Sequence, residues 1–260
     1  PDDPVQEVAD GSIDFEHVSF SYIGDKEKLA LKDVDIHIKS GETIGILGGT
    51  GSSKTTLVQL IPRMYDVTGG CLKVGGRDVK EYGLKSLRNQ VAVVLQKNVL
   101  FSGTIASNLR FGKRDATDEQ IKEAAAIAQA ADFIEEKQEK YDSDIAQGGS
   151  NVSGGQKQRL AIARAIAKQP KIYVFDDSFS ALDLKTDAAL RKALASKVKD
   201  STVIIVAQRI STILHAEQIL VLDDGKIVGL GTSEELLESC EVYQEIYNSQ
   251  FKKQEGGKTA

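Results

Sequence analysis

Residues 43–61 decide the fold, and they read TIGILGGTGSSKTTLVQLI. A short apolar stretch predicts a strand, and a glycine-rich loop, a lysine and two threonines lead from it into an apolar helix. This is the layout of a phosphate-binding loop, in which backbone N–H groups and a helix N-terminus hold phosphates. A glycine-rich turn without a ligand is the alternative, but it leaves the flanking strand and helix unexplained. We predict that nucleotide phosphates contact Gly48, Gly49, Thr50, Gly51, Ser52, Ser53, Lys54, Thr55 and Thr56. Within this set, Lys54 is expected to reach the β and γ phosphates and Thr55 to bind Mg²⁺.

One position departs from the usual loop pattern G-x-x-x-x-G-K-[ST]. The residue before Lys54 is Ser53 instead of glycine. If the backbone there must adopt a conformation that favours glycine, a serine costs about 1–3 kcal/mol. Because about 1.4 kcal/mol corresponds to a tenfold change in affinity, we expect Ser53 to weaken nucleotide binding.

The rest of the chain indicates two kinds of strand. Short continuous apolar runs, typical of parallel strands covered on both faces, occur at residues 91–95, 172–175 and 203–206. Alternating or hairpin patterns, typical of antiparallel strands, occur at residues 18–22, 34–38 and 71–74. Helical patterns with capping residues lie between them. We therefore predict an α/β fold: a P-loop NTPase core with a mixed, mainly parallel sheet, an antiparallel β subdomain and an inserted helical subdomain.

Composition predicts the boundaries of these parts. Residues 1–11 are acidic and contain two prolines, so we expect a linker, and the missing initiator Met favours a piece cut from a longer protein. Residues 12–96 and 166–249 are assigned to the nucleotide-binding core with its antiparallel subdomain. Residues 97–165 show helices without a strong strand and are assigned to the helical subdomain. The polar residues 250–260 are predicted to be a flexible tail.

The overall composition excludes several classes of protein. The chain has 260 residues, of which 41% are apolar, which is enough for a sizeable core. A net charge of −5 leaves no overall basic field for nucleic acid, so no nucleic-acid partner is expected. The longest apolar runs have five residues, far below the roughly 20 that cross a bilayer. Two distant cysteines and no signal-type N-terminus favour a reducing, cytoplasmic setting.

A second helix begins with Ser153-Gly154-Gly155-Gln156. Ser153 and Gln156 have the spacing of a capping box, and a simple helix cap is one interpretation. That interpretation leaves the two glycines unexplained, because each gives up about 1 kcal/mol of helix propensity relative to alanine. Bare N–H groups that a ligand must approach closely would explain them. The tetrapeptide resembles the signature motif of ATP-binding-cassette (ABC) ATPases, and its distance from the phosphate loop fits that family.

The resemblance extends to the acidic end of the apolar run at 172–175, and in this family it implies roles for particular residues. Asp176 would help to bind Mg²⁺, and Asp177 stands where hydrolytic members carry a glutamate that orients the attacking water. Gln208 stands where those members carry a histidine that contacts the γ-phosphate. Gln96 would sense Mg²⁺ and the membrane domain, although it could be a simple polar strand end. Tyr22 would stack on adenine, with a core strand position as the alternative.

The two substitutions Asp177 and Gln208, beside an intact signature motif, resemble the degenerate-site subunit of heterodimeric bacterial ABC exporters. The resemblance implies ATP and Mg²⁺ as ligands, a partner nucleotide-binding domain, and the transmembrane domains of an exporter. It also implies a place at the cytoplasmic face of the cell membrane, and weak or absent ATP hydrolysis by this chain alone. The alternatives are an ABC ATPase of a non-transport complex, in nucleic-acid maintenance or translation, and a nucleotide sensor that does not hydrolyse.

Overall fold

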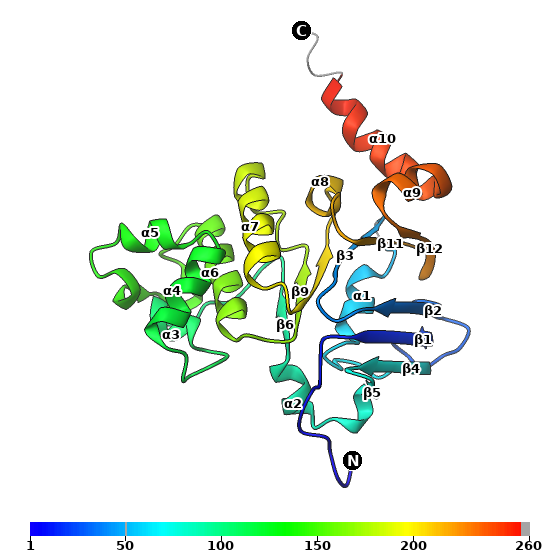
Figure 1. The fold of residues 1–260 in the computed structure, drawn as a ribbon, viewed down its shortest axis with the longest axis horizontal. Helices are drawn as coiled ribbons and strands as arrows, with labels where there is room; N and C mark the ends of the chain where they lie inside the picture. The colour runs from blue at the N-terminus through cyan, green and yellow to red at the C-terminus, as the bar shows by residue number, and fades with distance from the viewer. Residues whose placement is uncertain (50, 256–260) are drawn as a thin grey trace.

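The computed structural model describes residues 1–49 and 51–255, and its centre is a six-stranded sheet (Figure 1). The strand order is β12-β11-β3-β10-β9-β6, and neighbouring strands run parallel except for β11 and β12. The strands are β3 (Thr43–Gly48), β6 (Val91–Val94), β9 (Ile172–Asp176), β10 (Thr202–Val206), β11 (Gln218–Asp223) and β12 (Lys226–Gly231). The prediction of a mixed, mainly parallel sheet is confirmed.

Alternate residues along these strands face opposite sides of the sheet and enter two separate cores. In β10, Ile204 and Val206 belong to one core, whereas Val203 and Ile205 belong to the other. All residues of β10 are buried. Burial on both faces explains why the sequence shows continuous apolar runs here and no alternation of apolar and polar residues.

One face of the sheet is covered by α1 (Lys54–Gln59) and by a second, antiparallel sheet of order β2-β1-β4-β5. Its strands are β1 (Ile13–Phe20), β2 (Leu31–Ile38), β4 (Gly69–Val74) and β5 (Arg77–Asp78). In β2, Val34, Ile36 and Ile38 are buried while Asp35 and His37 between them are exposed. This is the one-sided alternation that the sequence predicted, and the antiparallel subdomain is confirmed. The short helices η1 (Val79–Glu81) and α2 (Leu84–Asn89) lead from it to β6.

The opposite face of the sheet is covered by helices, which occupy the green and yellow half of Figure 1. The helical lobe contains α3 (Ile105–Leu109), α4 (Asp118–Ile127), α5 (Ala131–Glu135), η2 (Lys140–Asp142), η3 (Gln147–Gly149) and α6 (Gly154–Ala167). Two-residue strands β7 (Gly103–Thr104) and β8 (Asp144–Ile145) pair within it. Helix α7 (Leu184–Lys197) contacts α4 of the lobe, and α8 (Ile210–Ile213) contacts α7 and β3. The inserted helical subdomain is confirmed, and it shares one continuous core with the sheet.

The C-terminal end corrects one prediction. After α9 (Ser233–Ser239), helix α10 runs from Glu241 to Glu255, so the expected tail at 250–260 is wrong for residues 250–255. Residues 256–260 lie outside the described part of the chain. Ile246, Tyr247 and Phe251 of α10 pack against the core. A docked helix needs only one apolar stripe, and Phe251 continues that stripe through a segment whose average composition is polar.

The N-terminal residues 1–11 form no helix, and the part around Val5 and Val8 lies against the domain. Val8 is buried, and Val5 exchanges backbone hydrogen bonds with the segment before α2: its N–H donates to Glu81, and its carbonyl accepts from Gly83. Among the described residues, no helix combines the length and apolar character that crossing a bilayer requires.

Candidate nucleotide site

The phosphate loop, residues 48–56, connects β3 to α1 at the carboxyl ends of the parallel strands. The Lys54 ammonium group donates to the carbonyl oxygens of Gly48 and Gly49, at 2.8 and 3.1 Å, and lies 3.4 Å from Ser52 Oγ. A side chain at Gly48 would collide with the backbone of β11, so packing requires glycine there. The lysine is thus held over the loop by carbonyl oxygens, close to where the phosphates are predicted to bind.

Ser53 occupies a strained position in this loop. Its φ of 73° and ψ of 28° place it in the left-handed region, which costs an L-residue about 1–2 kcal/mol. Its side chain makes no capping hydrogen bond to α1. Gly51 also has a positive φ, of 77°, and a side chain there would meet open space. The position that usually carries glycine therefore does require a glycine-like backbone. Thr50, also predicted to bind phosphate, lies outside the described residues.

The carboxylate of Asp176 faces the loop from the end of β9. Thr55 Oγ1 donates a hydrogen bond to Asp176 Oδ1 at 3.3 Å. Burial raises the pKa of Asp176, whereas the Thr55 hydrogen bond and the Lys54 charge act to lower it. Burial likewise lowers the pKa of Lys54, and Asp177 and Asp176 oppose that shift. The side chains of Lys54, Thr55 and Asp176 therefore influence one another electrostatically at the carboxyl end of the sheet.

These oxygen donors fit Mg²⁺. A threonine hydroxyl and a carboxylate are hard oxygen ligands of the kind Mg²⁺ takes alongside water and nucleotide phosphates. Thr55 is exposed, so its hydroxyl is open to a ligand, while Asp176 is only 8% exposed. Thr55 and Asp176 would hold the ion. Gln96, the third predicted ligand, is exposed after β6, and the structure gives no hydrogen bond from its side chain to either residue.

Asp177 follows Asp176 directly and also has left-handed backbone geometry, with a φ of 53°. Its N–H donates to the carbonyl of Val206 at 2.9 Å, which ties the end of β9 to the end of β10. Burial raises the pKa of Asp177, and the neighbouring Asp176 charge raises it further; Lys54 and Arg209 act in the opposite direction. Asp177 thus lies within the electrostatic reach of Lys54 in the phosphate loop.

Gln208 lies in the segment that leads from β10 to the first residue of α8, residues 207–210, which we call the switch loop. Its side chain is exposed. The next residue, Arg209, donates to the Phe179 carbonyl and to Asp187 Oδ2, each at 2.8 Å. The switch loop is thereby bound both to the segment between β9 and α7 and to α7 itself.

Asp187, on α7, is a residue that sequence reasoning missed. Its carboxylate is 2% exposed and accepts hydrogen bonds from Arg209 and Thr212, each at 2.8 Å, and from Arg191 at 2.6 Å. A signal was present, since Asp187 lies on the same helix face as the buried Leu190 and Leu194. An acidic residue on an apolar helix stripe indicates a buried polar contact.

Tyr22 lies next to the phosphate loop, just after β1. Its hydroxyl is 2.6 Å from Thr56 Oγ1, and its ring contacts Tyr65 edge to face, with ring centres 5.3 Å apart. Tyr22 remains 54% exposed. The core-strand alternative is therefore wrong for its ring, because an exposed aromatic face beside the loop is free to stack on a base.

Gln158 is a second residue that sequence reasoning missed. It binds the residue before Gln96, Leu95, to the segment after Asp177. Gln158, on α6, is 3% exposed and donates to the carbonyls of Leu95 and Ser178, at 3.0 and 2.7 Å. Asn98 donates in turn to Gln158 Oε1 at 2.8 Å. One buried amide thus connects the end of β6, the helix α6 and the segment after Asp177.

The signature turn, residues 153–156, begins α6. Ser153 Oγ accepts from the Gln156 N–H at 3.1 Å, and Gln156 Oε1 accepts from the Ser153 N–H at 3.2 Å, which completes the predicted capping box. A side chain added at Gly154 or Gly155 would meet open space, and neither has a positive φ. Packing within this chain therefore does not require these glycines. Among the described residues, no hydrogen bond or ion pair joins the signature turn to the phosphate loop.

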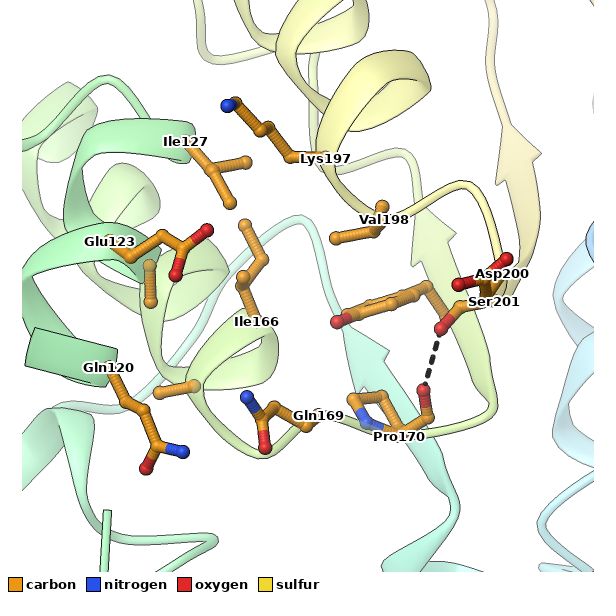
Figure 2. Close-up of a pocket in the computed structure, with 13 residues that line it drawn as sticks. Gln120, Glu123, Ile127, Ile166, Gln169, Pro170, Lys197, Val198, Asp200 and Ser201 are labelled. Atoms are coloured by element: carbon orange, nitrogen blue, oxygen red, sulfur yellow. Dashed lines mark hydrogen bonds between the residues drawn. The ribbon is translucent and has the colours of Figure 1, made fainter. Parts of the chain in front are cut away.

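A cavity of about 240 Å³ lies away from these residues, between the helical lobe and α7 (Figure 2). It opens at the amino ends of β9 and β10, where Ser201 Oγ donates to the Pro170 carbonyl at 2.9 Å. Gln120 and Glu123 of α4 approach it from one side, and Lys197 of α7 from the other. No predicted site residue lines this cavity, so it is separate from the candidate nucleotide site.

Together, a parallel sheet, a phosphate loop after its central strand β3 and carboxylates at the end of β9 define a P-loop NTPase fold. Comparison with known proteins then identifies the family. The family model described as "ABC transporter" matches residues 31–180, more than half of the chain. The chain belongs to the ABC transporter family.

Individual relatives agree with this assignment. A putative multidrug export ATP-binding/permease protein of Staphylococcus aureus (strain NCTC 8325 / PS 47) is 44% identical over 94% of this chain. The corresponding protein of the bovine strain RF122 / ET3-1 is 43% identical. The solved structure of a bacterial Atm1-family ABC exporter with ATP bound superposes with a TM-score of 0.90, at 34% identity, and covers 96% of this chain. The chain spans 42% of the length of these two S. aureus proteins and 43% of that exporter.

Proposed function

We propose that this chain is the ATP-binding domain of a multidrug-type ABC exporter, and that it binds Mg-ATP at the phosphate loop. The observation that carries this proposal is the contact between Thr55 Oγ1 and Asp176 Oδ1, beside the Lys54 ammonium group. This contact places a hydroxyl, a carboxylate and a cation together where a P-loop fold binds nucleotide phosphates. The relatives named as multidrug export proteins support the exporter assignment.

Each residue of the site has a separate role in the proposed binding of Mg-ATP. Lys54 is expected to donate to phosphate oxygens instead of the Gly48 and Gly49 carbonyls, and the N–H groups at the start of α1 add the favourable helix dipole. Bound Mg²⁺ would neutralise developing charge on the phosphate oxygens. Thr55 and Asp176 are to hold the ion, and the exposed ring of Tyr22 is to stack on the adenine.

We propose further that this site is degenerate and hydrolyses ATP slowly or not at all by itself. Asp177 is one methylene shorter than glutamate, and a misplacement of about 1 Å can lower a rate about 10²-fold. Gln208 has no imidazole and cannot exchange a proton with the γ-phosphate. Ser53 adds backbone strain to the loop. Binding depends on Lys54, Thr55 and Asp176, so binding is to persist better than turnover.

The signature turn is proposed to complete the active site of a partner domain in a heterodimer. Its two glycines lie at a helix N-terminus with open space around them, which suits the approach of a phosphate from outside the chain. The absence of hydrogen bonds between this turn and the chain's own phosphate loop, among the described residues, supports the same arrangement.

A patch of exposed apolar side chains is proposed to receive a cytoplasmic segment of the transmembrane domains. The patch extends from the end of β6 to the helical lobe and comprises Val93, Leu95, Val99, Phe101 and Phe111. The rings of Phe101 and Phe111 stack with centres 4.5 Å apart, and Arg164 lies over the Phe101 ring. Exposed apolar patches of this kind mark interaction sites. Docking there places the chain at the cytoplasmic face of the membrane and connects Gln96 to transport.

A mixing experiment tests the heterodimer proposal. The partner is a nucleotide-binding domain that carries the catalytic glutamate and histidine but has a damaged signature motif. ATP hydrolysis is expected only in the mixture and is expected to be lost when this chain carries Gly155→Asp. An acidic residue suits the first turn of a helix, so the variant is expected to fold, and its carboxylate is expected to repel the nucleotide phosphates. Gly69→Asp, at another glycine with room for a side chain, is the control.

The results also separate the alternatives. Brisk hydrolysis by this chain alone would contradict the degenerate site, and a mixture unaffected by Gly155→Asp would contradict the role of the signature turn. Nucleotide binding without hydrolysis in any mixture would instead favour the nucleotide sensor. The net charge of −5 and the "ABC transporter" family match weigh against a nucleic-acid complex.

A further inference from the structure

The C-terminal helix α10 contacts the switch loop through one side chain. Gln250 Nε2 donates to the Gln208 carbonyl at 2.6 Å, and Gln250 Oε1 accepts from the Ile210 N–H at 2.8 Å. Both ends of the amide are therefore used, on either side of Arg209. The contact with Ile210 spans 40 residues of sequence and joins the last described helix to the loop that carries Gln208.

The contact provides a hydrogen-bond acceptor for the N–H of Ile210 at the start of α8. Ile210 is the first residue of α8, and the preceding Arg209 makes no side-chain cap to that helix. The first N–H groups of a helix have no partner within it. Gln250 supplies one from another helix, while the Arg209 side chain points its hydrogen bonds toward Asp187 and the Phe179 carbonyl. The switch loop is thus bound by two helices: Asp187 of α7 binds Arg209, and Gln250 of α10 binds the residues on either side of Arg209.

Gln250 itself lies on a firmly attached helix. The Tyr243 hydroxyl is 2.6 Å from Ser233 Oγ, and Gln244 Nε2 donates to the Leu237 carbonyl at 2.7 Å, so α10 is bound to α9. Tyr247 and Phe251 pack against the core on either side of Gln250 in sequence, with ring centres 4.4 Å apart. A side chain on such a support holds its partner more precisely than one on a free tail.

We propose that Gln250 is a positioning residue for the switch loop: it fixes the backbone of Gln208 so that this side chain faces the terminal phosphate of bound nucleotide. The inference rests on the proposed function, because it assumes that Gln208 faces the γ-phosphate. Residues from the C-terminal helix would then belong to the machinery that distinguishes a triphosphate from a diphosphate.

Two measurements on the full 260-residue chain test the proposal. The first is hydrogen exchange at the Ile210 amide, which needs no nucleotide. Gln250→Leu removes both hydrogen bonds at similar volume and is expected to speed exchange there about three- to tenfold. The control Gln244→Leu removes a different glutamine contact of α10, the one to the Leu237 carbonyl, and is expected to leave Ile210 exchange unchanged. Gln250→Glu keeps the acceptor for Ile210 and is expected to retain its protection.

The second measurement is the ratio of affinities for AMP-PNP and ADP in the presence of Mg²⁺. Gln250→Leu is expected to reduce the preference for the triphosphate about three- to tenfold with little change in ADP affinity. Gln244→Leu is expected to preserve the ratio even if it lowers the unfolding temperature. Equal Ile210 exchange in Gln250→Leu and the native chain would overturn the contact. Faster exchange with an unchanged ratio would overturn the positioning role.

Loss of all nucleotide binding by the native chain would overturn the proposed function itself, and the exchange result would still decide whether the contact exists.

Discussion

The phosphate loop and the signature turn use glycine in opposite ways. Ser53 replaces glycine where the backbone is left-handed, with a φ of 73°. Gly154 and Gly155 have no positive φ, and side chains added there would meet open space. The loop thus lacks a glycine that its own geometry requires, and the turn keeps two that its geometry does not. This difference is the one expected if, as proposed, the turn serves a ligand bound by another domain and the chain's own loop is degenerate.

The two regions also differ in how they are held. Around the phosphate loop and the switch loop, polar side chains make hydrogen bonds between distant elements, as Asp187 and Gln250 do. In the signature turn, the side chains of Ser153 and Gln156 bond to each other's backbone and, within the described part of the chain, to no distant element. Substitutions in the first region are therefore expected to have the larger effects on the fold.

The largest effect is expected from Asp187→Ala. This change leaves Arg209, Arg191 and Thr212 without their buried partner, which typically costs about 3–5 kcal/mol. The free energy of unfolding, measured by urea titration, is expected to fall by about that amount. Asp183→Ala, at the exposed cap of the same helix, is the control and is expected to lose less. Equal losses of unfolding free energy in the two variants would show that the buried hydrogen bonds of Asp187 stabilise the fold no more than an exposed helix cap does.

Lys54→Met is expected to weaken binding of a nucleoside triphosphate about 10²-fold, because charge-assisted hydrogen bonds to phosphate are worth about 1.5–3 kcal/mol. The stability of the nucleotide-free chain is expected to change little, because methionine has a side chain of similar length and the change removes only the hydrogen bonds to the Gly48 and Gly49 carbonyls. Isothermal titration in the presence of Mg²⁺ measures the change. Gly155→Ala in the signature turn is the matched variant, and its affinity is expected to equal that of the native chain. A loss of affinity in Gly155→Ala alone would reverse the assignment of the two regions.

Opposite substitutions at the two glycine positions sharpen the comparison. Ser53→Gly relieves a left-handed residue and is expected to raise the free energy of unfolding by about 0.5–1 kcal/mol, after the added freedom of the unfolded chain is subtracted. It is also expected to tighten triphosphate binding up to about tenfold. Gly155→Ala is expected to raise stability by about 0.5–1 kcal/mol through helix propensity. Ser53→Ala keeps the strain and serves as the control. A gain in Ser53→Ala equal to that in Ser53→Gly would remove the strain argument.

The smallest effect is a pH dependence at Asp177. Burial and the Asp176 charge raise the pKa of Asp177, so its contribution to stability is present below the unfolded value of about 3.9 and is lost as pH rises through the folded value. Asp177→Asn removes the charge and tolerates the left-handed backbone. The variant is expected to be more stable than the native chain at pH 7, with a gain that shrinks toward pH 4 in thermal unfolding curves.

Asp183 supplies a control of opposite sign. Hydrogen bonds from Thr186 lower the pKa of Asp183, so its carboxylate contributes stability at pH 7 that is lost at acid pH. Asp183→Asn is therefore expected to show no gain at neutral pH. A gain in Asp177→Asn that is the same at every pH would contradict the electrostatic cause.

The sequence was sufficient for the parts of the fold that depend on local pattern. The apolar runs of β9 and β10, the phosphate loop after β3 and the capping box at Ser153 all lie where the residues predicted them. These features depend on residues close together in the chain, so periodicity and turn chemistry are enough.

The features that were not predicted depend on contacts between distant residues. The apolar stripe of α7 indicates a buried contact at Asp187 but does not identify its partner Arg209. Gln158 looks like an ordinary polar position of a helix until the fold brings Ser178 to it. The polar composition of residues 250–255 predicts a tail, yet Gln250 and Phe251 attach this end of α10 to the domain. The left-handed backbone of Asp177 follows from the joint between β9 and β10 and has no local sequence signal.

The most direct measurement of a degenerate site is steady-state ATP hydrolysis by two chains at equal concentration. One is the native chain, and the other carries Asp177→Glu together with Gln208→His. Both retain Lys54, Thr55 and the signature turn, so any difference reflects the two replaced groups. The native chain is expected to bind Mg-ATP yet to hydrolyse it about 10²-fold or more slowly than the double variant. Equal rates in the two chains would contradict the degenerate site.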